Sequence, residues 1–296
     1  MKRFLVAFFA LAFALGVSAQ KTLSLEGADE TVRLWDNTTA KYSNYETHDE
    51  EWRKDKKLSI KHTSSCELYI YKATEEKNKG VAIAIFPGGG YANLNFSVSL
   101  AKWYASQGVT AALVKYRLPN YGHKEATLED AVGAVKYLRT RTDLGINPAK
   151  VGVTGSSAGG HLAAWVSNAL PDDEKPAFAV LHYPAIDRTS PYYINTKVYT
   201  GNLLGKDFSL QEAKDISAQN MVSATTPATM LLLCDDDTAI PPTSSVSYYK
   251  ALINHGVKAS MHIYPQGGHS LKNHINEYQA AILDWLDFLG MHTQKR

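Results

Sequence analysis

Apolar runs of strand length alternate with amphipathic stretches of helix length from about residue 65 to residue 290. The run 81–86 is continuously apolar between Gly80 and Pro87, as in a strand that is buried on both faces. The stretch 127–140 has apolar residues three and four apart, as in a helix that packs on one side. Such alternation favours parallel β-α-β units in one sheet. We therefore expect an α/β fold whose mostly parallel central sheet carries helices on both faces.

The expected elements follow from the same two periodicities. Strands are predicted at 67–71, 81–86, 110–116, 150–154, 177–182, 228–234 and 259–264, and helices at 96–107, 127–140, 161–169, 241–255 and 273–289.

The first 19 residues have the pattern of a secretory signal peptide. Lys2 and Arg3 precede an apolar run, and Val17-Ser18-Ala19 is a small-x-small cleavage pattern. The run is short for a membrane-spanning helix, although an uncleaved anchor or a buried N-terminal helix remains an alternative. We therefore expect an exported protein, either periplasmic or extracellular. Removing residues 1–19 leaves basic and acidic side chains in equal number, so neither nucleic acid nor a membrane is an expected partner.

Two other segments interrupt the regular alternation. Residues 20–62 are polar and aromatic and include the charge-dense stretch 46–57, which indicates a solvated N-terminal arm or lid. Residues 185–222 are polar and rich in tyrosine, which indicates an insertion near one end of the sheet. Because no interdomain linker is visible, we expect one catalytic domain over residues 63–296.

The sequence Gly155-Ser156-Ser157-Ala158-Gly159 is a G-x-S-x-G motif between a predicted strand and a predicted helix. A nucleophilic serine on such a sharp turn adopts a strained backbone conformation, and its neighbours must be small. The N-terminus of the following helix also favours developing negative charge. Ser157 is therefore the candidate nucleophile; a purely structural turn and Ser156 as the nucleophile are the alternatives.

A serine nucleophile needs a base, and that base needs an orienting carboxylate. Asp237 follows the predicted strand 228–234, and His269 follows the strand 259–264 on a Gly-Gly loop. Both lie where ligands bind in open α/β sheets, at the carboxyl ends of strands. Asp235 and Asp236 are the alternatives to Asp237, and we favour Asp236 among them. Among the other histidines in the later half, His161, His262 and His274 fall within predicted helices or strands.

A glycine run, Pro87-Gly88-Gly89-Gly90-Tyr91, follows an early predicted strand. Acyl transfer creates an oxyanion, and preorganised backbone N–H groups stabilise it. Glycines allow the backbone to approach that oxygen, and the N–H of Ala158 would be a second donor. A phosphate-binding loop is excluded because no Lys-Ser/Thr pair follows on a helix, whereas a plain turn stays possible.

Together these motifs resemble the α/β-hydrolase superfamily over residues 65–290, and most closely its esterase branch with a His-Gly-Gly-Gly loop, which includes bacterial acetyl xylan and feruloyl esterase-like proteins. The matching segments are 87–91, 116–118, 155–163, 237–241 and 267–269. The resemblance implies that Gly89 and Gly90 donate to the oxyanion. Pro87 stands where that loop has its histidine, which leaves the donors among Gly88 to Gly90 open. Arg117 and Asp130 also match and are interpreted as structural.

The resemblance also places Cys66 and Cys234 on distant strands, so we expect both to be reduced and buried. No cofactor is implied, and no His, Cys or carboxylate cluster has convincing spacing for a metal.

The expected function is that of a serine carboxylesterase with Ser157, Asp237 and His269 as its triad. The expected substrates are acyl esters of plant cell-wall carbohydrate such as xylan, and we favour acetyl among the acyl groups. Tyr91 and the tyrosines at 192, 193 and 199 are candidates for the carbohydrate-binding face. The alternatives are a feruloyl, small-ester or lipid esterase, a peptidase of the prolyl oligopeptidase type, and a non-catalytic carbohydrate-binding module.

Overall fold

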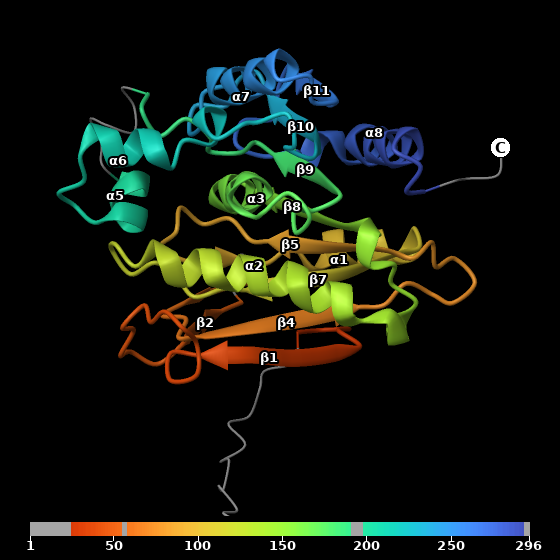
Figure 1. The fold of residues 1–296 in the computed structure, drawn as a ribbon, viewed down its shortest axis with the longest axis horizontal. Coiled ribbons are helices and arrows are strands. Elements are labelled where there is room, and N and C mark those ends of the chain that lie inside the picture. Colours follow the sequence, from red (N-terminus) through yellow and green to blue (C-terminus); the bar gives the residue numbers. More distant parts are fainter. Residues whose placement is uncertain (1–24, 55–57, 191–197, 293–296) are drawn as a thin grey trace, which may run out of the picture.

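The computed structural model describes residues 25–54, 58–190 and 198–292. An eight-stranded sheet runs through the molecule in the order β1-β4-β7-β5-β8-β9-β10-β11 (Figure 1). Its strands are β1 (Glu30–Asp36), β4 (Ser65–Tyr71), β5 (Val81–Phe86), β7 (Val109–Lys115), β8 (Val151–Ser156), β9 (Phe178–His182), β10 (Ala228–Cys234) and β11 (Ala259–Tyr264). The strands from β7 to β11 in this order pair in parallel, while β1 and β4 pair antiparallel at one edge. The predicted α/β fold with a mostly parallel sheet is confirmed.

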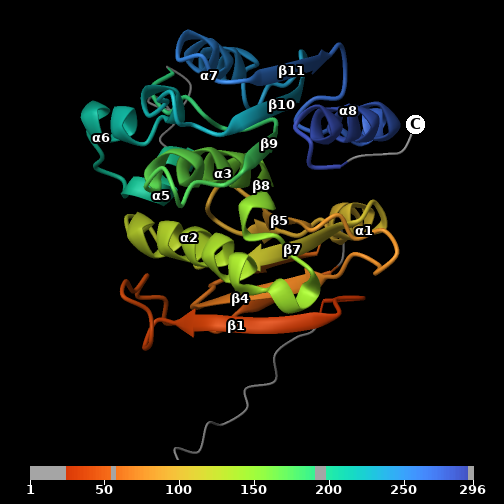
Figure 2. The same ribbon diagram turned by 45° about the vertical axis from the view of Figure 1, so that its right-hand side comes forward.

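Helices cover both faces of the sheet. Figure 2 shows α1 and α8 on one side and α2, α3 and α7 on the other. The helices are α1 (Val98–Ser106), α2 (Lys124–Thr140), α3 (Ala158–Ala169), α5 (Val198–Leu204), α6 (Leu210–Asp215), α7 (Thr243–Asn254) and α8 (Ile275–Phe288). Short 3-10 turns occur at Thr142–Leu144, Pro148–Lys150, Ala218–Asn220 and Lys272–His274. The central strands β5, β7 and β8 are almost wholly buried because both of their faces pack against helices.

The segment expected to be an N-terminal arm is part of the folded sheet structure. β1 extends the main sheet, and its Trp35 donates a hydrogen bond from Nε1 to Asp130 Oδ1 at 2.5 Å. A second, three-stranded sheet consists of β2 (Glu51–Arg53), β3 (Ser59–Lys61) and β6 (Leu94–Asn95). The expectation of a separate arm is therefore wrong over these elements, because strand pairing and buried partners hold the segment in place. The charge-dense stretch is mostly exposed over residues 46–54, as expected.

The insertion predicted at 185–222 contains α5, α6 and the 3-10 turn at 218–220. Figure 1 shows α5 and α6 together at the left of the molecule, beyond one end of the sheet. The signal peptide predicted at residues 1–19 lies outside the described residues. Within the described part of the chain, no helix combines the length and the apolar character that crossing a membrane requires.

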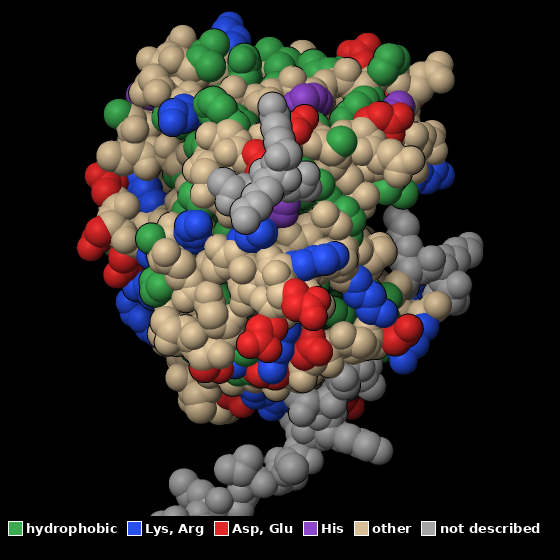
Figure 3. All heavy atoms as spheres, turned by 90° about the vertical axis from the view of Figure 1, so that its right-hand side faces the viewer, with side chains coloured by type: hydrophobic (Ala, Val, Ile, Leu, Met, Phe, Trp, Pro, Cys, Tyr) green, Lys and Arg blue, Asp and Glu red, His purple; other side chains and the backbone are tan. Residues whose placement is uncertain are grey.

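Buried charged groups are paired inside this fold. Arg117 is fully buried, and its guanidinium contacts Asp130 and Glu129 at 2.7 and 3.0 Å, which fits the structural interpretation of the Arg117–Asp130 pair. The two cysteines are free and buried, on β4 and β10, as expected. On the face drawn in Figure 3, basic and acidic side chains are interspersed rather than gathered by sign.

Candidate active site

Ser157 occupies the turn between β8 and α3. β8 ends at Ser156, α3 begins at Ala158, and Ser157 has φ 56° and ψ −118°. A positive φ is uncommon for a residue other than glycine and marks local strain. The neighbouring chain holds this conformation: Ser157 N–H donates to His182 O at 3.0 Å, and Ser157 O accepts from Ala185 N–H at 3.1 Å. The turn therefore projects the hydroxyl in a fixed direction.

The two glycines of the motif are required by close backbone packing. A Cβ on Gly155 would lie 2.2 Å from Gly159 O, and a Cβ on Gly159 would lie 2.0 Å from Phe86 O. Any side chain at either position would therefore push α3 away from β8 or β5. The sequence interpretation of these residues as steric requirements of the turn agrees with this geometry.

A chain of hydrogen bonds joins Ser157, His269 and Asp237. Ser157 Oγ lies 2.8 Å from His269 Nε2, and His269 Nδ1 lies 2.7 Å from Asp237 Oδ2. Because a carboxylate only accepts, Nδ1 carries the proton and Nε2 accepts from the serine hydroxyl. Asp237 is nearly inaccessible to solvent, and its Oδ1 accepts from the N–H groups of Ala239 and Ile240 at 2.9 Å each. The structure thus brings together the three residues predicted as a triad.

The alternatives to these residues have other contacts. Asp236 Oδ1 accepts from Gly268 N–H at 2.7 Å, so its carboxylate supports the backbone of the His269 loop rather than the imidazole. Backbone hydrogen bonds from Gly268 and Gly267 lower the pKa of Asp236. Ser156 borders the same cavity as Ser157, but the hydroxyl that lies against His269 is that of Ser157.

The triad opens on a cavity of about 500 Å³ that the glycine run also borders. Gly88, Gly89, Gly90 and Ala158 all line this cavity. Among the described residues, no hydrogen-bond acceptor is recorded for the N–H groups of Gly89, Gly90 and Ala158. Gly89 has φ 137° and Gly90 φ 62°, values that favour glycine. These N–H groups are available to an oxyanion, and the choice among the loop glycines stays a prediction.

Tyr91 does not line this cavity, and the expectation that it contacts substrate is wrong. Its side chain is only 2% exposed, and its hydroxyl lies 2.7 Å from His161 Nδ1. Tyr91 has φ 61°, and its backbone turn directs the ring into the core behind the glycine run. Tyr199 does line the cavity, as expected, whereas the other two candidate tyrosines, 192 and 193, lie outside the described residues.

Several cavity residues were not predicted from the sequence. The ring of Tyr183 packs against the His269 imidazole with ring centroids 4.7 Å apart, and burial raises the pKa of Tyr183. Arg188 is fully buried and brings a cation to the cavity wall, with its guanidinium 5.5 Å from the Tyr91 ring. Both residues follow β9 in the chain. The sequence contains one indication of their role: both follow a buried strand, and residues in that position lie near the carboxyl edge of the sheet, where ligands bind.

His161 lies behind the glycine run rather than in the cavity. Its Nε2–H donates to Ile216 O at 2.6 Å, so its Nδ1 accepts from the Tyr91 hydroxyl. Burial, together with the charge of Arg188, holds the pKa of His161 well below its usual range. The structural role predicted for His161 agrees with these contacts.

Comparison with known proteins places this fold and site in a family. Residues 96–295 match the model of the prolyl oligopeptidase family. The chain is 34% identical over 203 residues to an acetylxylan esterase of Xylanibacter ruminicola. This alignment covers 66% of this chain but only 42% of that relative. The chain therefore spans less than half the length of this relative.

Solved structures agree with this family placement. An acetyl ester-xyloside bifunctional hydrolase from Caldicellulosiruptor lactoaceticus is 30% identical, with a TM-score of 0.71 over 77% of this chain and 90% of that chain. The carboxylesterase Cest-2923 from Lactobacillus plantarum shares the fold. It is 18% identical, with a TM-score of 0.66 over 84% of this chain and 100% of that chain. The chain belongs to the prolyl oligopeptidase family of α/β-hydrolases.

Proposed function

We propose that this protein is a serine carboxylesterase that removes acetyl groups from plant cell-wall carbohydrate such as xylan. The observation that carries the proposal is the hydrogen-bonded chain from Ser157 through His269 to Asp237, which opens on a cavity beside unpaired peptide N–H groups. One similar protein is an acetylxylan esterase and another is an acetyl ester-xyloside bifunctional hydrolase, and these names support this substrate class. The signal-peptide pattern of residues 1–19 supports an exported enzyme that meets such polymers outside the cytoplasm.

In the first half of the reaction, Ser157 Oγ attacks the ester carbonyl carbon while His269 Nε2 takes the serine proton. Asp237 keeps Nδ1 protonated and stabilises the imidazolium that forms. Collapse of the tetrahedral intermediate breaks the bond to the sugar oxygen, which receives the proton from Nε2. The acetyl group is then bound to Ser157, and the sugar leaves with a free hydroxyl.

The tetrahedral intermediate carries a negative charge on the former carbonyl oxygen. The N–H of Ala158 at the start of α3 and those of Gly89 and Gly90 would donate to it. Such preorganised donors act in the transition state, and losing one typically costs about 3 kcal/mol. In the second half of the reaction, water attacks the acyl carbon while His269 Nε2 takes one of its protons. Collapse of the second tetrahedral intermediate breaks the bond to Ser157 Oγ, which receives that proton from Nε2, and acetate leaves.

The names of the relatives and the small steric demand of an acetyl group support acetyl as the acyl group. Tyr199 and Asn93 border the cavity and offer an aromatic ring and a side-chain amide to a polar substrate. An acetyl group has the smallest steric demand among the acyl groups considered. A feruloyl ester, a longer acyl ester of a simple alcohol and a prolyl peptide are the competing substrates.

The test measures turnover of four substrates by one preparation: acetylated xylo-oligosaccharides, p-nitrophenyl butyrate, methyl ferulate and a prolyl peptide anilide. We expect acetate release from the oligosaccharides to have the highest kcat/KM. Ser157→Ala should lower that value by at least about a thousandfold, because triad residues act as a unit. Ser156→Ala is the matched control and should retain most of the activity.

The results separate the parts of the proposal. Faster turnover of the butyrate ester than of acetylated sugars would contradict the carbohydrate substrate and leave a general esterase. Cleavage of the anilide alone would establish a peptidase. Absence of turnover of every ester, or an unchanged rate in Ser157→Ala, would overturn the esterase mechanism itself.

A further inference from the structure

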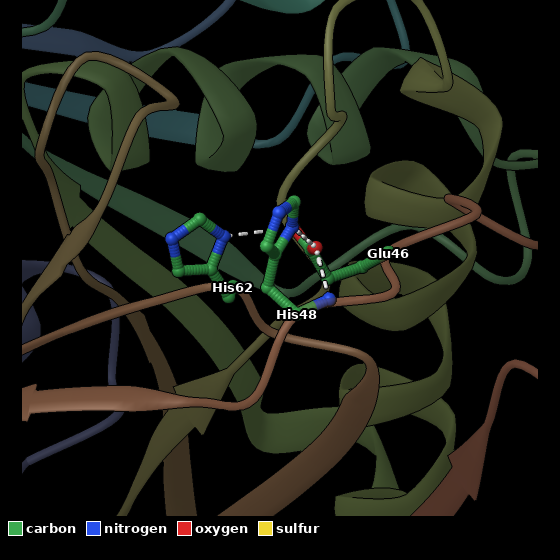
Figure 4. A group of neighbouring side chains, drawn as sticks. All are labelled: Glu46, His48 and His62. Atoms are coloured by element: carbon green, nitrogen blue, oxygen red, sulfur yellow. Dashed lines mark hydrogen bonds and ion pairs between the residues drawn. The ribbon is translucent and has the colours of Figure 1, made fainter.

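Three potential metal ligands meet outside the candidate active site. Glu46 and His48 belong to the loop between β1 and β2, and His62 directly follows β3. Figure 4 shows both imidazole rings beside the Glu46 carboxylate. His48 Nδ1 lies 2.8 Å from Glu46 Oε1, and His62 Nδ1 lies 3.2 Å from Glu46 Oε2. The three ligand atoms all lie within 4.8 Å of one another.

The pairing of two strands explains why these residues meet. β2 and β3 are antiparallel, with Glu51 opposite Lys61 and Arg53 opposite Ser59. The chain that enters β2 therefore runs beside the chain that leaves β3, which brings His48 next to His62. The spacing of the three residues along the sequence gave no indication of this meeting, since it matches no common metal-binding pattern.

We propose that Glu46, His48 and His62 bind a divalent metal ion of the Zn²⁺ class. Two imidazoles and one carboxylate are a common zinc ligand set that leaves a fourth position for water. Zinc bonds of about 2.0–2.2 Å in a tetrahedron place ligand atoms roughly 3.3–3.6 Å apart. The two histidine–carboxylate separations are 2.8 and 3.2 Å, and all three ligand atoms lie within 4.8 Å of one another, so side-chain adjustments of about an ångström would complete the site. A neutral imidazole binds the ion through Nδ1 once its proton has moved to Nε2, so no change in charge is required.

The surroundings suit a bound cation. Glu46 and His48 border a polar cavity of about 580 Å³, whose wall also carries the carboxylates of Asp36, Asp49 and Glu50. Glu46 is nearly buried, with 6% of its side chain exposed, whereas His48 is 73% exposed and His62 35% exposed. The group is thus anchored on a buried carboxylate and remains open to ions from solvent.

His62 has an unusual backbone that supports the same site. Its φ of 57° lies in the left-handed region, which few non-glycine residues adopt, although histidine does so more often than most. Residues held in such conformations cluster at functional sites, because surrounding contacts must maintain them. Here the conformation directs the imidazole toward Glu46, the group with which it forms its recorded hydrogen bond.

A metal at this position would fasten the N-terminal segment to the small sheet. β3 pairs with β6, and Asn95 at the end of β6 donates its N–H to Gly88 O at 2.8 Å. The small sheet therefore joins the metal ligands at one end to the glycine run at the other. We expect the ion to stabilise the folded protein, and the triad itself contains no ligand of this site.

The test is a calorimetric titration of Zn²⁺ into protein without a polyhistidine tag, in metal-free buffer. We expect about one Zn²⁺ per chain. His48→Ala should weaken binding by at least about tenfold, because even residues that only support metal ligands cost that much when changed. His62→Asn, which tolerates the same positive φ, should weaken binding similarly. His255→Ala removes an exposed histidine on another surface and should bind as the wild type does.

A second measurement tests the expected stabilisation. Zn²⁺ should raise the Tm of the wild type and of His255→Ala but not that of His48→Ala. The proposal is overturned if the wild type takes up no Zn²⁺ or if His48→Ala binds with unchanged affinity. Loss of the bound ion in His269→Ala, with retention in His48→Ala, would also overturn it and would place the ion at the candidate active site.

Discussion

Asp236 and Asp237 are adjacent in the chain, yet their carboxylates have different partners. Asp237 is nearly buried and contacts the His269 imidazole with one oxygen and two peptide N–H groups with the other. Asp236 is exposed and accepts from the peptide N–H of Gly268. One carboxylate thus orients the imidazole, while its neighbour orients the loop that carries the imidazole.

This difference predicts the effect of replacing each residue. Asp237→Asn should lower kcat/KM for an acetyl ester by roughly a thousandfold or more, because an amide cannot hold the imidazole in the required tautomer. Asp236→Asn should have a much smaller effect, since its amide oxygen can still accept from Gly268 N–H. The comparison is made at one pH with both variants shown to be folded by circular dichroism. A larger loss in Asp236→Asn than in Asp237→Asn would assign the orienting role to Asp236.

The predicted site residues that the structure brings together are those whose position depends on local chain geometry. Ser157 lies on a turn that its glycines require, and Asp237 and His269 follow strands whose ends meet at one edge of the sheet. Tyr91 was misplaced because the direction of its ring depends on φ and on His161, which lies 70 positions further along the chain. No local pattern contains that contact.

At the scale of elements, the strands and helices were predicted well and the N-terminal segment was not. Long apolar runs such as β5 and β10 determine their own burial, and the observed bounds agree with those expected. Charged residues dominate the composition of the stretch 46–57, and this composition indicates a solvated arm. Its Glu50 nevertheless lies 2.6 Å from Lys115, a lysine on β7 with only 1% of its side chain exposed. Composition does not show such a partner when it is distant in the sequence.

The edge of the main sheet depends on one carboxylate that joins three strands. Glu67 on β4 contacts Arg33 on β1 at 2.7 Å and Lys115 on β7 at 3.2 Å. Burial opposes the ionisation of Glu67, but Lys115 and Arg33 outweigh it, and the pKa of Glu67 lies below its ordinary value. A carboxylate of this kind stabilises the fold above its unfolded-state pKa and loses that effect as pH falls through its folded-state pKa.

We therefore predict that Glu67→Gln lowers the free energy of unfolding by roughly 2–3 kcal/mol at pH 7, since the substitution leaves the buried Lys115 and the partly exposed Arg33 without this partner. The difference from the wild type should narrow as pH falls below about 4.5, because the unfolded wild-type chain then takes up a proton that the folded protein binds only at lower pH. Urea unfolding at pH 7 and at pH 4 measures both effects. Glu75→Gln, at an exposed position, is the control and should match the wild type. A difference that stays constant between the two pH values would contradict the role of ionisation.

At the scale of the whole molecule, the buried titratable groups form two zones. On β4, β7 and α2 they are charged and paired, as in Arg117 with Asp130. Behind the Ser157 turn, the second zone includes two histidines, His161 and His182, whose pKa values burial lowers. The two zones respond to acid in the same direction: the first loses ion pairs through groups such as Glu67, and the second must take up protons in order to unfold.

His182 makes this acid response measurable at a single position. It lies at the end of β9, and burial lowers its pKa from 6.5 to about 4. Below pH 6.5 the unfolded chain therefore binds a proton that the folded chain does not, and stability falls as pH falls until about pH 4. The slope is about 1.4 kcal/mol per pH unit, so between pH 7 and pH 5 the wild type should lose about 2 kcal/mol more than His182→Gln.

Urea unfolding at several pH values gives these slopes, and comparing slopes removes any uniform effect of the substitution on packing. His255→Gln, at an exposed position, should keep the wild-type slope. Parallel pH profiles for the wild type and His182→Gln would show that His182 is protonated in the folded protein as readily as in the unfolded chain.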